Sequence, residues 1–223
     1  MSEVGTRPRE ASLRDGTRVL LRPIEPDDKW RLEEGLARLS PQSRYRRFHG
    51  NLASFSAEQL AYLTEVDHHD HEAWAALDPD DLDAPGLGVA RYVRLADEPT
   101  VAEAAVTVLD EYQGRGLGTL LFRQLAVSAI EHGIRTFRNY VLAEQEDVLE
   151  VFDQLGAQRK EVEPGVVQID LALPDDPALL PVPGMRELFR ELARGLLPPI
   201  LWRFVWPAGL SGRAPRRARR IPS

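Results

Sequence analysis

Residues 100–122 read TVAEAAVTVLDEYQGRGLGTLLF. The first ten are rich in small and β-branched side chains, which predicts a strand over 100–109. Leucines at positions 117, 120, 121 and 125 share one helical face and predict a helix over 117–132. Three glycines at alternate positions, Gly114, Gly116 and Gly118, separate the two elements. The stretch therefore predicts a strand, a glycine-rich loop and a helix in direct succession.

A strand, a glycine loop and a helix together form an anion-binding device. The helix N-terminus offers unpaired backbone N–H groups and the positive end of the helix dipole. Glycines allow a phosphate to approach the backbone, and Arg115 can add a charge-assisted contact. The dinucleotide motif G-x-G-x-x-G does not fit, because Thr119 occupies the place of its third glycine, and no P-loop lysine follows. The alternative is a tight turn in which the glycines only save space.

Composition limits the range of functions. The 223 residues suit one domain, alone or with an appendage, and there is no cysteine for a disulfide, a thiolate metal site or a nucleophile. The formal net charge is −7, and residues 213–223 hold five arginines and no acid, so the rest carries −7 − 5 = −12. An acidic body argues against nucleic acid as a partner and fits a cationic substrate.

The remaining patterns predict an α/β domain with a mixed sheet and helices on its faces. Ser56 and Gln59 form a capping-box pattern at the start of one helix. Strands are predicted over 17–22, 72–77, 87–95, 137–142 and 166–173, and helices over 27–39, 57–63 and 147–155, with a helical turn from Pro41.

These elements divide the chain into a flexible leader (1–12), one domain (13–174) and a C-terminal extension (175–223). The leader has no apolar signal-peptide segment, and no apolar run approaches the ~20 residues of a membrane span. We therefore expect a cytoplasmic protein.

Four segments together resemble one known family. They are LRDGTRVLLRPIEPDD, LSPQSRYRRF, YLTEVDHHDHEAW and AEAAVTVLDEYQGRGLG. The last contains Gln113-Gly114-Arg115-Gly116-Leu117-Gly118, which matches the signature [QR]-x-x-G-x-[GA] of the GNAT superfamily of acetyl-CoA-dependent N-acetyltransferases. Residues 12–174 are similar to the GNAT domain of bacterial protein lysine acetyltransferases.

This resemblance implies a GNAT fold, a twisted and mostly antiparallel sheet flanked by helices, and acetyl-CoA as co-substrate. It also implies that the backbone of residues 113–119 (Gln113, Gly114, Arg115, Gly116, Leu117, Gly118, Thr119) holds the CoA pyrophosphate. Val106 and Val108 are then expected to pair with the pantetheine arm, as an added strand at an open sheet edge.

Glu103 matches the position of the family's catalytic glutamate, in the strand before the glycine loop. A lysine amine ionises near ~10.4, so a base must remove its proton before it attacks a thioester at neutral pH. A carboxylate among small apolar residues is otherwise poorly placed in a strand. The alternative is a solvent-facing glutamate without a chemical role.

Three positions depart from the family pattern. Many GNAT enzymes have a tyrosine general acid where this chain has Phe152, and a cofactor-contacting asparagine where it has Gln145. Ala157 replaces the usual phenylalanine after Gly156. The thiolate product is then expected to leave without a protein acid, or to take its proton from water.

Two other clusters attract attention. His68, His69 and His71 lie among acids, but neighbours on an extended segment point to opposite faces, so we predict no metal site. Asp67 and His71 instead match a recurrent D-x-x-x-H pattern of the family. The arginines of SRYRRF are interpreted as structural.

The resulting hypothesis is an N-acetyltransferase that acts on a protein lysine side chain by direct attack in a ternary complex. Two alternatives stay open, a small-amine acetyltransferase and a weakly active acyl-CoA-binding regulatory module. In the extension, an amphipathic helix from Met185, two tryptophans and a basic tail predict either packing on the body, a homodimer contact or a membrane-surface contact through 185–220.

Overall fold

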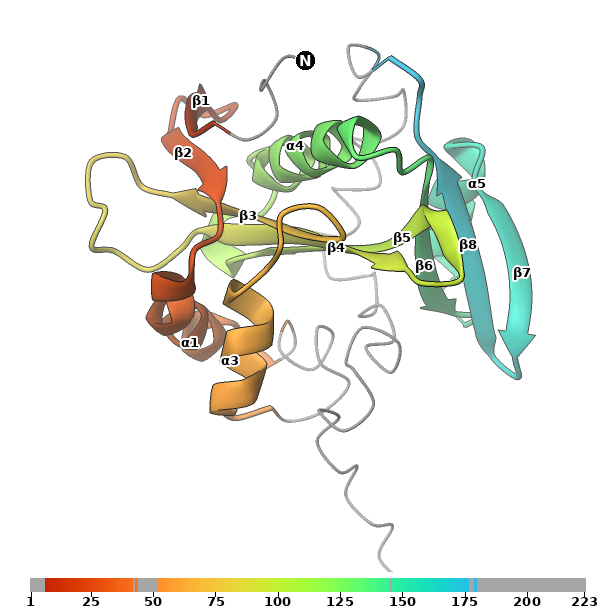
Figure 1. Ribbon diagram of the computed structural model, residues 1–223, viewed down its shortest axis with the longest axis horizontal. Coiled ribbons are helices and arrows are strands. Elements are labelled where there is room, and N and C mark those ends of the chain that lie inside the picture. The colour runs from red at the N-terminus through yellow and green to blue at the C-terminus, as the bar shows by residue number, and fades with distance from the viewer. Residues whose placement is uncertain (1–6, 42, 44–51, 145, 177–178, 180–223) are drawn as a thin grey trace, which may run out of the picture.

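The computed structural model describes residues 7–41, 43, 52–144, 146–176 and 179. In these residues, helices flank one sheet (Figure 1). The strands are β1 (Arg9–Ser12), β2 (Arg18–Pro23), β3 (His71–Leu77), β4 (Gly88–Leu95), β5 (Glu98–Val108), β6 (Thr136–Leu142), β7 (Gln158–Glu163) and β8 (Val166–Ala172). The α-helices are α1 (Lys29–Arg38), α3 (Ala57–Thr64), α4 (Leu117–Glu131) and α5 (Glu146–Gln154), and the 3₁₀ helices are η1 (Pro26–Asp28) and η2 (Asp110–Tyr112).

The described strands form one sheet in the order β1-β2-β3-β4-β5-β6-β8-β7. All neighbours are antiparallel except β5 and β6, which run parallel. The chain passes from β5 to β6 through α4, because parallel neighbours need a long crossover connection. The prediction of a mixed, mostly antiparallel sheet with flanking helices is confirmed.

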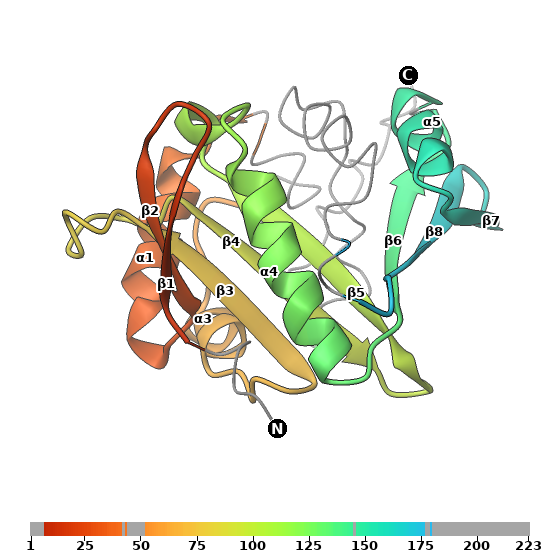
Figure 2. The same ribbon diagram turned by 90° about the horizontal axis from the view of Figure 1, so that it is seen from above.

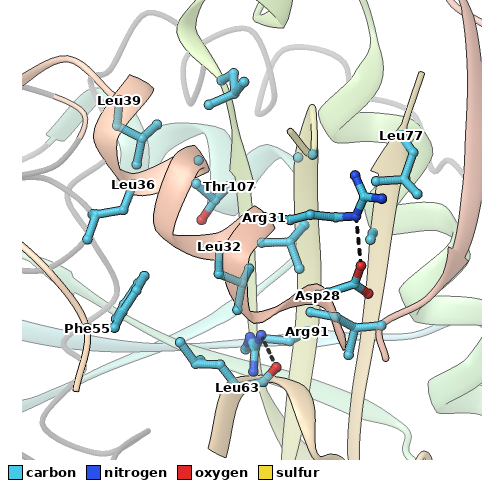
Figure 3. A pocket seen from close by; sticks show the side chains of 17 residues that line it. Asp28, Arg31, Leu32, Leu36, Leu39, Phe55, Leu63, Leu77, Arg91 and Thr107 are labelled. Carbon is cyan, nitrogen blue, oxygen red and sulfur yellow. Dashed lines mark hydrogen bonds and ion pairs between the residues drawn. The ribbon is translucent and has the colours of Figure 1, made fainter. Parts of the chain in front are cut away.

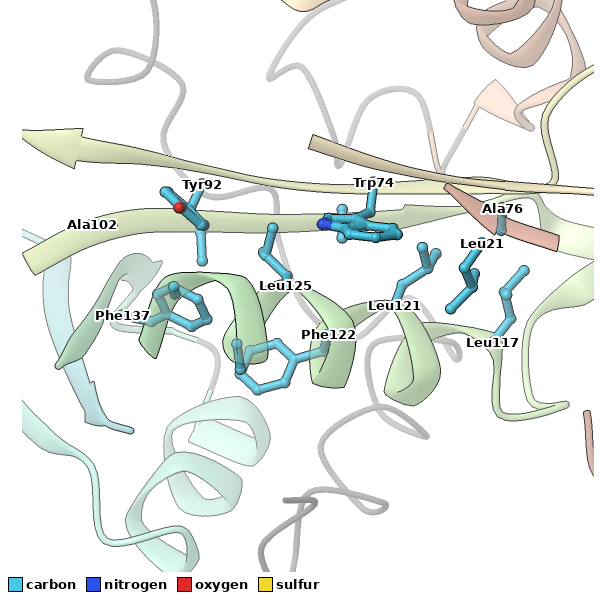
Figure 4. Packing of buried hydrophobic residues seen from close by; sticks show 14 of the residues in the cluster. Leu21, Trp74, Ala76, Tyr92, Ala102, Leu117, Leu121, Phe122, Leu125 and Phe137 are labelled. Atoms are coloured by element: carbon cyan, nitrogen blue, oxygen red, sulfur yellow. The ribbon is translucent and has the colours of Figure 1, made fainter. Parts of the chain in front are cut away.

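Helix α4 covers one face of the sheet, and α1 and α3 lie on the other (Figures 1 and 2). Leu117, Leu121 and Leu125 recur every four residues along α4 and are completely buried, as their spacing predicts. They belong to one core cluster with Trp74 of β3 (Figure 4), whose indole N–H donates to Ser128 Oγ at 3.0 Å. This packing fixes which face of each strand points towards α4.

The two faces of β5 carry different chemistry. Successive side chains of a strand point to opposite faces. Ala102 and Ala104 belong to the core cluster under α4. Glu103 therefore projects to the opposite face of the sheet, the face that α1 and α3 occupy.

Two strands were not predicted. Residues 9–12, assigned above to a flexible leader, form β1, which pairs with β2 across a turn at Gly16 (φ 86°). Strand β7 is an edge strand in which every residue is exposed, and it pairs with β8 across a turn at Gly165 (φ 79°). Neither strand shows an apolar pattern, because β7 is exposed throughout and in β1 only Ala11 packs against the core. Pairing with the neighbouring strand is what orders them.

The capping box at α3 is confirmed. The Gln59 N–H donates to Ser56 Oγ at 3.1 Å, and the Ser56 N–H donates to Gln59 Oε1 at 2.9 Å. The arginines of SRYRRF and the predicted C-terminal helix and basic tail lie outside the described residues. None of the helices in the described part of the chain is long and apolar enough to cross a membrane.

A buried ion cluster joins β2 to the start of α1. Asp28 is 3% exposed and accepts two hydrogen bonds from Arg22, at 2.6 and 2.7 Å. It also accepts from Arg31 Nε at 3.0 Å and from the Glu25 N–H at 2.8 Å. The cluster ties the strand, the 3₁₀ turn and the helix together.

Asp28→Ala is therefore expected to lower the free energy of unfolding by ~3–5 kcal/mol, because it leaves a largely buried guanidinium without its counterion. Urea denaturation measures this change. Asp80→Ala is the matched control, since Asp80 pairs with Arg18 on the surface and its removal is expected to change stability little. Equal losses from both variants would contradict the assignment.

Candidate active site

The glycine loop presents a row of free backbone donors at the start of α4. Gly114 (φ 72°) and Gly116 (φ 99°, the N-cap of α4) adopt left-handed conformations that favour glycine. The backbone N–H groups of residues 114–119 donate to no acceptor in the described part of the chain. Such a run of unpaired donors at a helix N-terminus fits an anionic group such as a diphosphate.

The side chains of the motif have other tasks. Gln113 donates from Nε2 to the Val108 carbonyl at 3.1 Å, which closes the turn between β5 and the loop. Arg115 pairs with Asp15 at 3.3 Å and lies over the ring of Tyr112 at 5.3 Å. Leu117, the first residue of α4, is completely buried in the core cluster. These three side chains have partners within the protein, so the unpaired donors of the motif in the described residues are its backbone N–H groups.

Arg14 is a loop neighbour that the sequence analysis missed. It lies in the β1–β2 turn, and its backbone N–H donates to the Arg115 carbonyl at 3.2 Å. A Cβ atom at Gly116 would lie 3.5 Å from Arg14 Nε. Arg14 is exposed and forms no ion pair within the described residues. No motif identifies it, because only the hairpin brings it to the loop.

Strand β5 has an open edge next to this loop. β5 and β6 pair over three residues only, Val101–Glu103 with Thr136–Arg138, and then diverge (Figure 2). In the described part of the chain, the rest of β5 has a partner only on its β4 side. Val106 and Val108 lie on this stretch, and their side chains pack against the core under α4. Within the described residues their backbone edge on the β6 side has no strand partner, an arrangement suited to strand addition by an extended ligand, and the pairing of Val106 and Val108 with pantetheine stays a prediction.

Glu103 lies at the point where β5 and β6 diverge. Its neighbours across the sheet are Val93 of β4 and Arg138 of β6. The residue is only 4% exposed, and burial raises the pKa of its carboxyl to about 7, while the charge of Arg138 opposes part of that rise. A carboxyl group with a pKa near neutrality is suited to accept a proton at physiological pH.

Polar side chains surround Glu103 on the same face. The Tyr62 ring lies 4.8 Å from the ring of His71, and Arg91 Nη1 lies 3.1 Å from His71 Nε2. Burial, and then the charge of Arg91, lower the pKa of His71 to about 3, so its imidazole is neutral at pH 7. Asp67 accepts the backbone N–H of His71 at 2.9 Å. The D-x-x-x-H pattern thus builds a hydrogen-bonded turn.

The other histidines have protein partners as well. His68 Nδ1 lies 2.9 Å from Glu72 Oε1, and His69 Nδ1 lies 2.8 Å from Asp70 Oδ1. Within the residues that the structure describes, no three His or acidic residues are placed to bind one metal ion.

An apolar cavity of about 80 Å³ lies between α1 and the sheet, on the face that carries Glu103 (Figure 3). Leu32 and Leu36 of α1 and Thr107 of β5 line it. Arg91 forms part of the wall and donates to the Leu63 carbonyl at 2.9 Å. Glu103 is not among the lining residues. The cavity neighbours the candidate site without containing its acid.

Residues 40–157, just over half of the chain, match the sequence profile of the acetyltransferase (GNAT) family. The chain belongs to this family. The match contains Glu103, the open part of β5 and the glycine loop. The GNAT fold predicted from the sequence is therefore confirmed.

Individual proteins similar to this chain are acetyltransferases as well. Acetyltransferase Pat of Mycolicibacterium smegmatis is 33% identical over 190 residues, which are 85% of this chain and 56% of that protein. Acetyltransferase PA5475 of Pseudomonas aeruginosa is 37% identical over 124 residues, 56% of this chain and 66% of that protein. The crystal structure of the GNAT domain of S. lividans PAT matches with a TM-score of 0.64 and 32% identity, over 74% of this chain and 97% of that one. This GNAT chain thus spans less than two thirds of either curated relative.

The positions that depart from the GNAT pattern are only partly visible. Phe152 of α5 is buried in a cluster with Leu149 and Ile169, so it serves as a core residue there. Ala157 packs against the same cluster. Gln145 lies outside the described residues, and its predicted contact with the cofactor stays a prediction.

Proposed function

We propose that this GNAT protein transfers an acetyl group from acetyl-CoA to a primary amine, namely a protein lysine side chain, while both substrates are bound. One observation carries the proposal. A buried carboxyl group with a pKa of about 7, Glu103, lies at the start of an open strand edge that leads to a loop of free N–H donors. In this proposal the base Glu103, the pantetheine-binding edge of β5 and the phosphate-binding loop follow one another along the chain.

Each part of the site has a distinct task in this proposal. The N–H groups of residues 114–119 bind the pyrophosphate, and the backbone of Val106 and Val108 aligns the pantetheine arm. Acetyl-CoA supplies the activated acetyl group as a thioester. Glu103 takes one proton from the lysine ammonium, the amine nitrogen attacks the thioester carbonyl and the C–N bond forms. The C–S bond then breaks, and water carries the second N–H proton from the nitrogen to the leaving thiolate. The thiolate leaves without a protein acid at position 152, which is feasible because thiols ionise near ~8.5.

Choice of acceptor rests on similarity and charge. The sequence resembles the GNAT domain of protein lysine acetyltransferases, and the chain without its last eleven residues carries a net charge of −12, from −7 − 5. An acidic surface attracts cationic amines of either size. A cytoplasmic location, and a homodimer or membrane contact through residues 185–220, remain predictions beside this proposal.

The test offers acetyl-CoA together with lysine-containing proteins and small amines, and measures thiol release and product masses. Acetyl-lysine on protein is expected. Acetylation of small amines alone would instead identify a small-molecule acetyltransferase. Tight binding of acetyl-CoA without transfer to any amine would favour a regulatory module, the alternative that Phe152 raises.

The proposed base should also destabilise the fold in its ionised form. The pKa of Glu103 lies at about 7 in the folded state, above its ordinary value of 4.5. Below 4.5 the carboxyl is protonated in both states. Between pH 4.5 and 7 the unfolded state loses this proton while the folded state keeps it, so stability falls across this range and levels off above pH 7, where the carboxyl is ionised in both states.

The free energy of unfolding of Glu103→Gln, relative to that of wild type, is therefore expected to rise by on the order of 3 kcal/mol from pH 4.5 to pH 8. Urea denaturation of both proteins at several pH values measures the difference. Glu58→Gln, an exposed position on α3, serves as the control. A stability difference that is the same at pH 4.5 and pH 8 would contradict the raised pKa.

A further inference from the structure

Arg138 is the cation next to the proposed base. It lies opposite Glu103 in the β5–β6 register, in the last residue pair before the strands diverge. Paired residues on neighbouring strands project to the same face, so the guanidinium and the carboxylate share one side of the sheet. Arg138 is 9% exposed. A side chain of its length normally reaches solvent unless partners hold it.

Two carboxylates hold Arg138 in place. Asp170, its neighbour on β8, accepts from Nε and from Nη2, both at 2.8 Å. Glu98, at the start of β5, accepts from Nη2 at 3.1 Å and also from Nη1. These bonds raise the pKa of Arg138, so its charge is permanent. Three strands thus fix one cation beside Glu103.

The other titratable groups around Glu103 do not supply such a charge. Tyr62 of α3 and Tyr140 of β6 are neutral at pH 7, because burial raises the pKa of each phenol. His71 is neutral as well, with a pKa of about 3. Arg91 of β4 faces the same side but lies opposite Ala105, two residues further along β5. In the described residues, the fixed cation closest in register to Glu103 is Arg138.

Resting on the function proposed above, we propose that Arg138 is a positioning residue for Glu103, a clamped cation that favours the ionised form of the buried base. A buried carboxylate without a counter-charge would stay protonated and could not accept a proton. The two clamping acids have a further consequence. Arg138, Asp170 and Glu98 together carry a net charge of −1, so the cation assists the base without repelling the incoming lysine ammonium.

The pH dependence of kcat/KM for acetyl transfer to a lysine acceptor tests this role in the full chain. Arg138→Gln is expected to move the acid limb of the profile to higher pH, because burial is then unopposed. An opposite charge this close changes a carboxyl pKa by ~1–3, so kcat/KM at pH 6.5 should fall by roughly tenfold or more. At pH 9 the variant should approach wild type. Arg138→Lys keeps the charge and should lie between the two.

Asp170→Asn gives the opposite sign. It removes a compensating charge while Glu98 still holds the guanidinium, so the acid limb should move to lower pH. If Arg138 and Asp170 only stabilised the fold, both variants would have a lower rate at every pH, and the acid limb would not move in opposite directions in the two. Arg94→Gln is the matched control: Arg94 is held by Asp70 and lies opposite Ala102, on the other face of the sheet from Glu103, so its loss should leave the limb unchanged.

The outcomes separate this inference from the proposed function. If Glu103→Gln abolishes the acid limb but Arg138→Gln leaves it at the wild-type pH, the role of Arg138 is wrong and the base assignment stands. If Glu103→Gln keeps both the rate and the limb, the base assignment itself fails. Arg138→Gln and Asp170→Asn displacing the limb in the same direction would also overturn the clamp. Should Arg138→Gln not fold, the Arg138→Lys and Asp170→Asn profiles decide the question.

Discussion

Replacing Glu103 with glutamine is expected to lower the rate of acetyl transfer at pH 7 by ~10²–10⁴-fold, the usual contribution of a positioned base. Glutamine has almost the same size and polarity but cannot take a proton from the lysine ammonium. The glycine loop and the open edge of β5 are unchanged, so binding of acetyl-CoA should persist. Steady-state kinetics, with calorimetry for the cofactor, measures both quantities.

The defect should also depend on pH. As pH rises towards ~10, the lysine amine loses its proton to solvent, the base becomes dispensable, and the variant should approach wild type. Glu72→Gln is a matched control, because Glu72 is equally buried in the same sheet but pairs with His68 on the other face. Its transfer rate should stay within a few-fold of wild type. A Glu103→Gln enzyme with the wild-type rate at pH 7 would remove Glu103 from the mechanism.

The second large effect is expected at the glycine loop. Gly116→Asp puts a carboxylate at the N-cap of α4, within the run of residues 114–119 whose backbone N–H groups have no described acceptor. The side chain would occupy the phosphate site and repel a diphosphate. Affinity for acetyl-CoA should fall by ~100-fold or more, since removal of charge-assisted contacts and like-charge repulsion each amount to a few kcal/mol. Calorimetry on the folded variant measures the loss.

Two variants isolate the cause. Gly116→Ala introduces the same left-handed strain without a charge, and its Cβ would meet Arg14 only at ordinary contact distances of 3.5 Å and beyond. Gly133→Asp places an aspartate at another left-handed glycine (φ 81°), beyond the far end of the same helix and with open space around it. Both should bind acetyl-CoA far better than Gly116→Asp. Unchanged affinity in Gly116→Asp would exclude the loop as the phosphate site.

Local pattern was sufficient to predict much of this fold. The leucines of α4 and the alternation along β8 each follow a buried face whose period appears in the sequence, and the capping box of α3 is a local pattern of two residues. The glycine loop was also predictable from the sequence, since the left-handed conformations at Gly114 and Gly116 strongly favour glycine. These features depend on neighbours in the chain, so the chain alone specifies them. The family resemblance then assigned Glu103, which periodicity could only mark as an unusual acid in a strand.

Other features depend on contacts between distant segments. Strand β7 has no buried face and β1 buries only part of Ala11, so neither has an apolar pattern. Arg14 reaches the loop only because the first hairpin is hydrogen-bonded to Arg115, a hundred residues away. The pKa of Glu103 reflects burial under other elements together with the charge of Arg138, whose clamp joins β5, β6 and β8. The sequence determined which residue types were available for chemistry. The tertiary structure decided their charge states, because desolvation and Coulomb interactions depend on distances in space rather than along the chain.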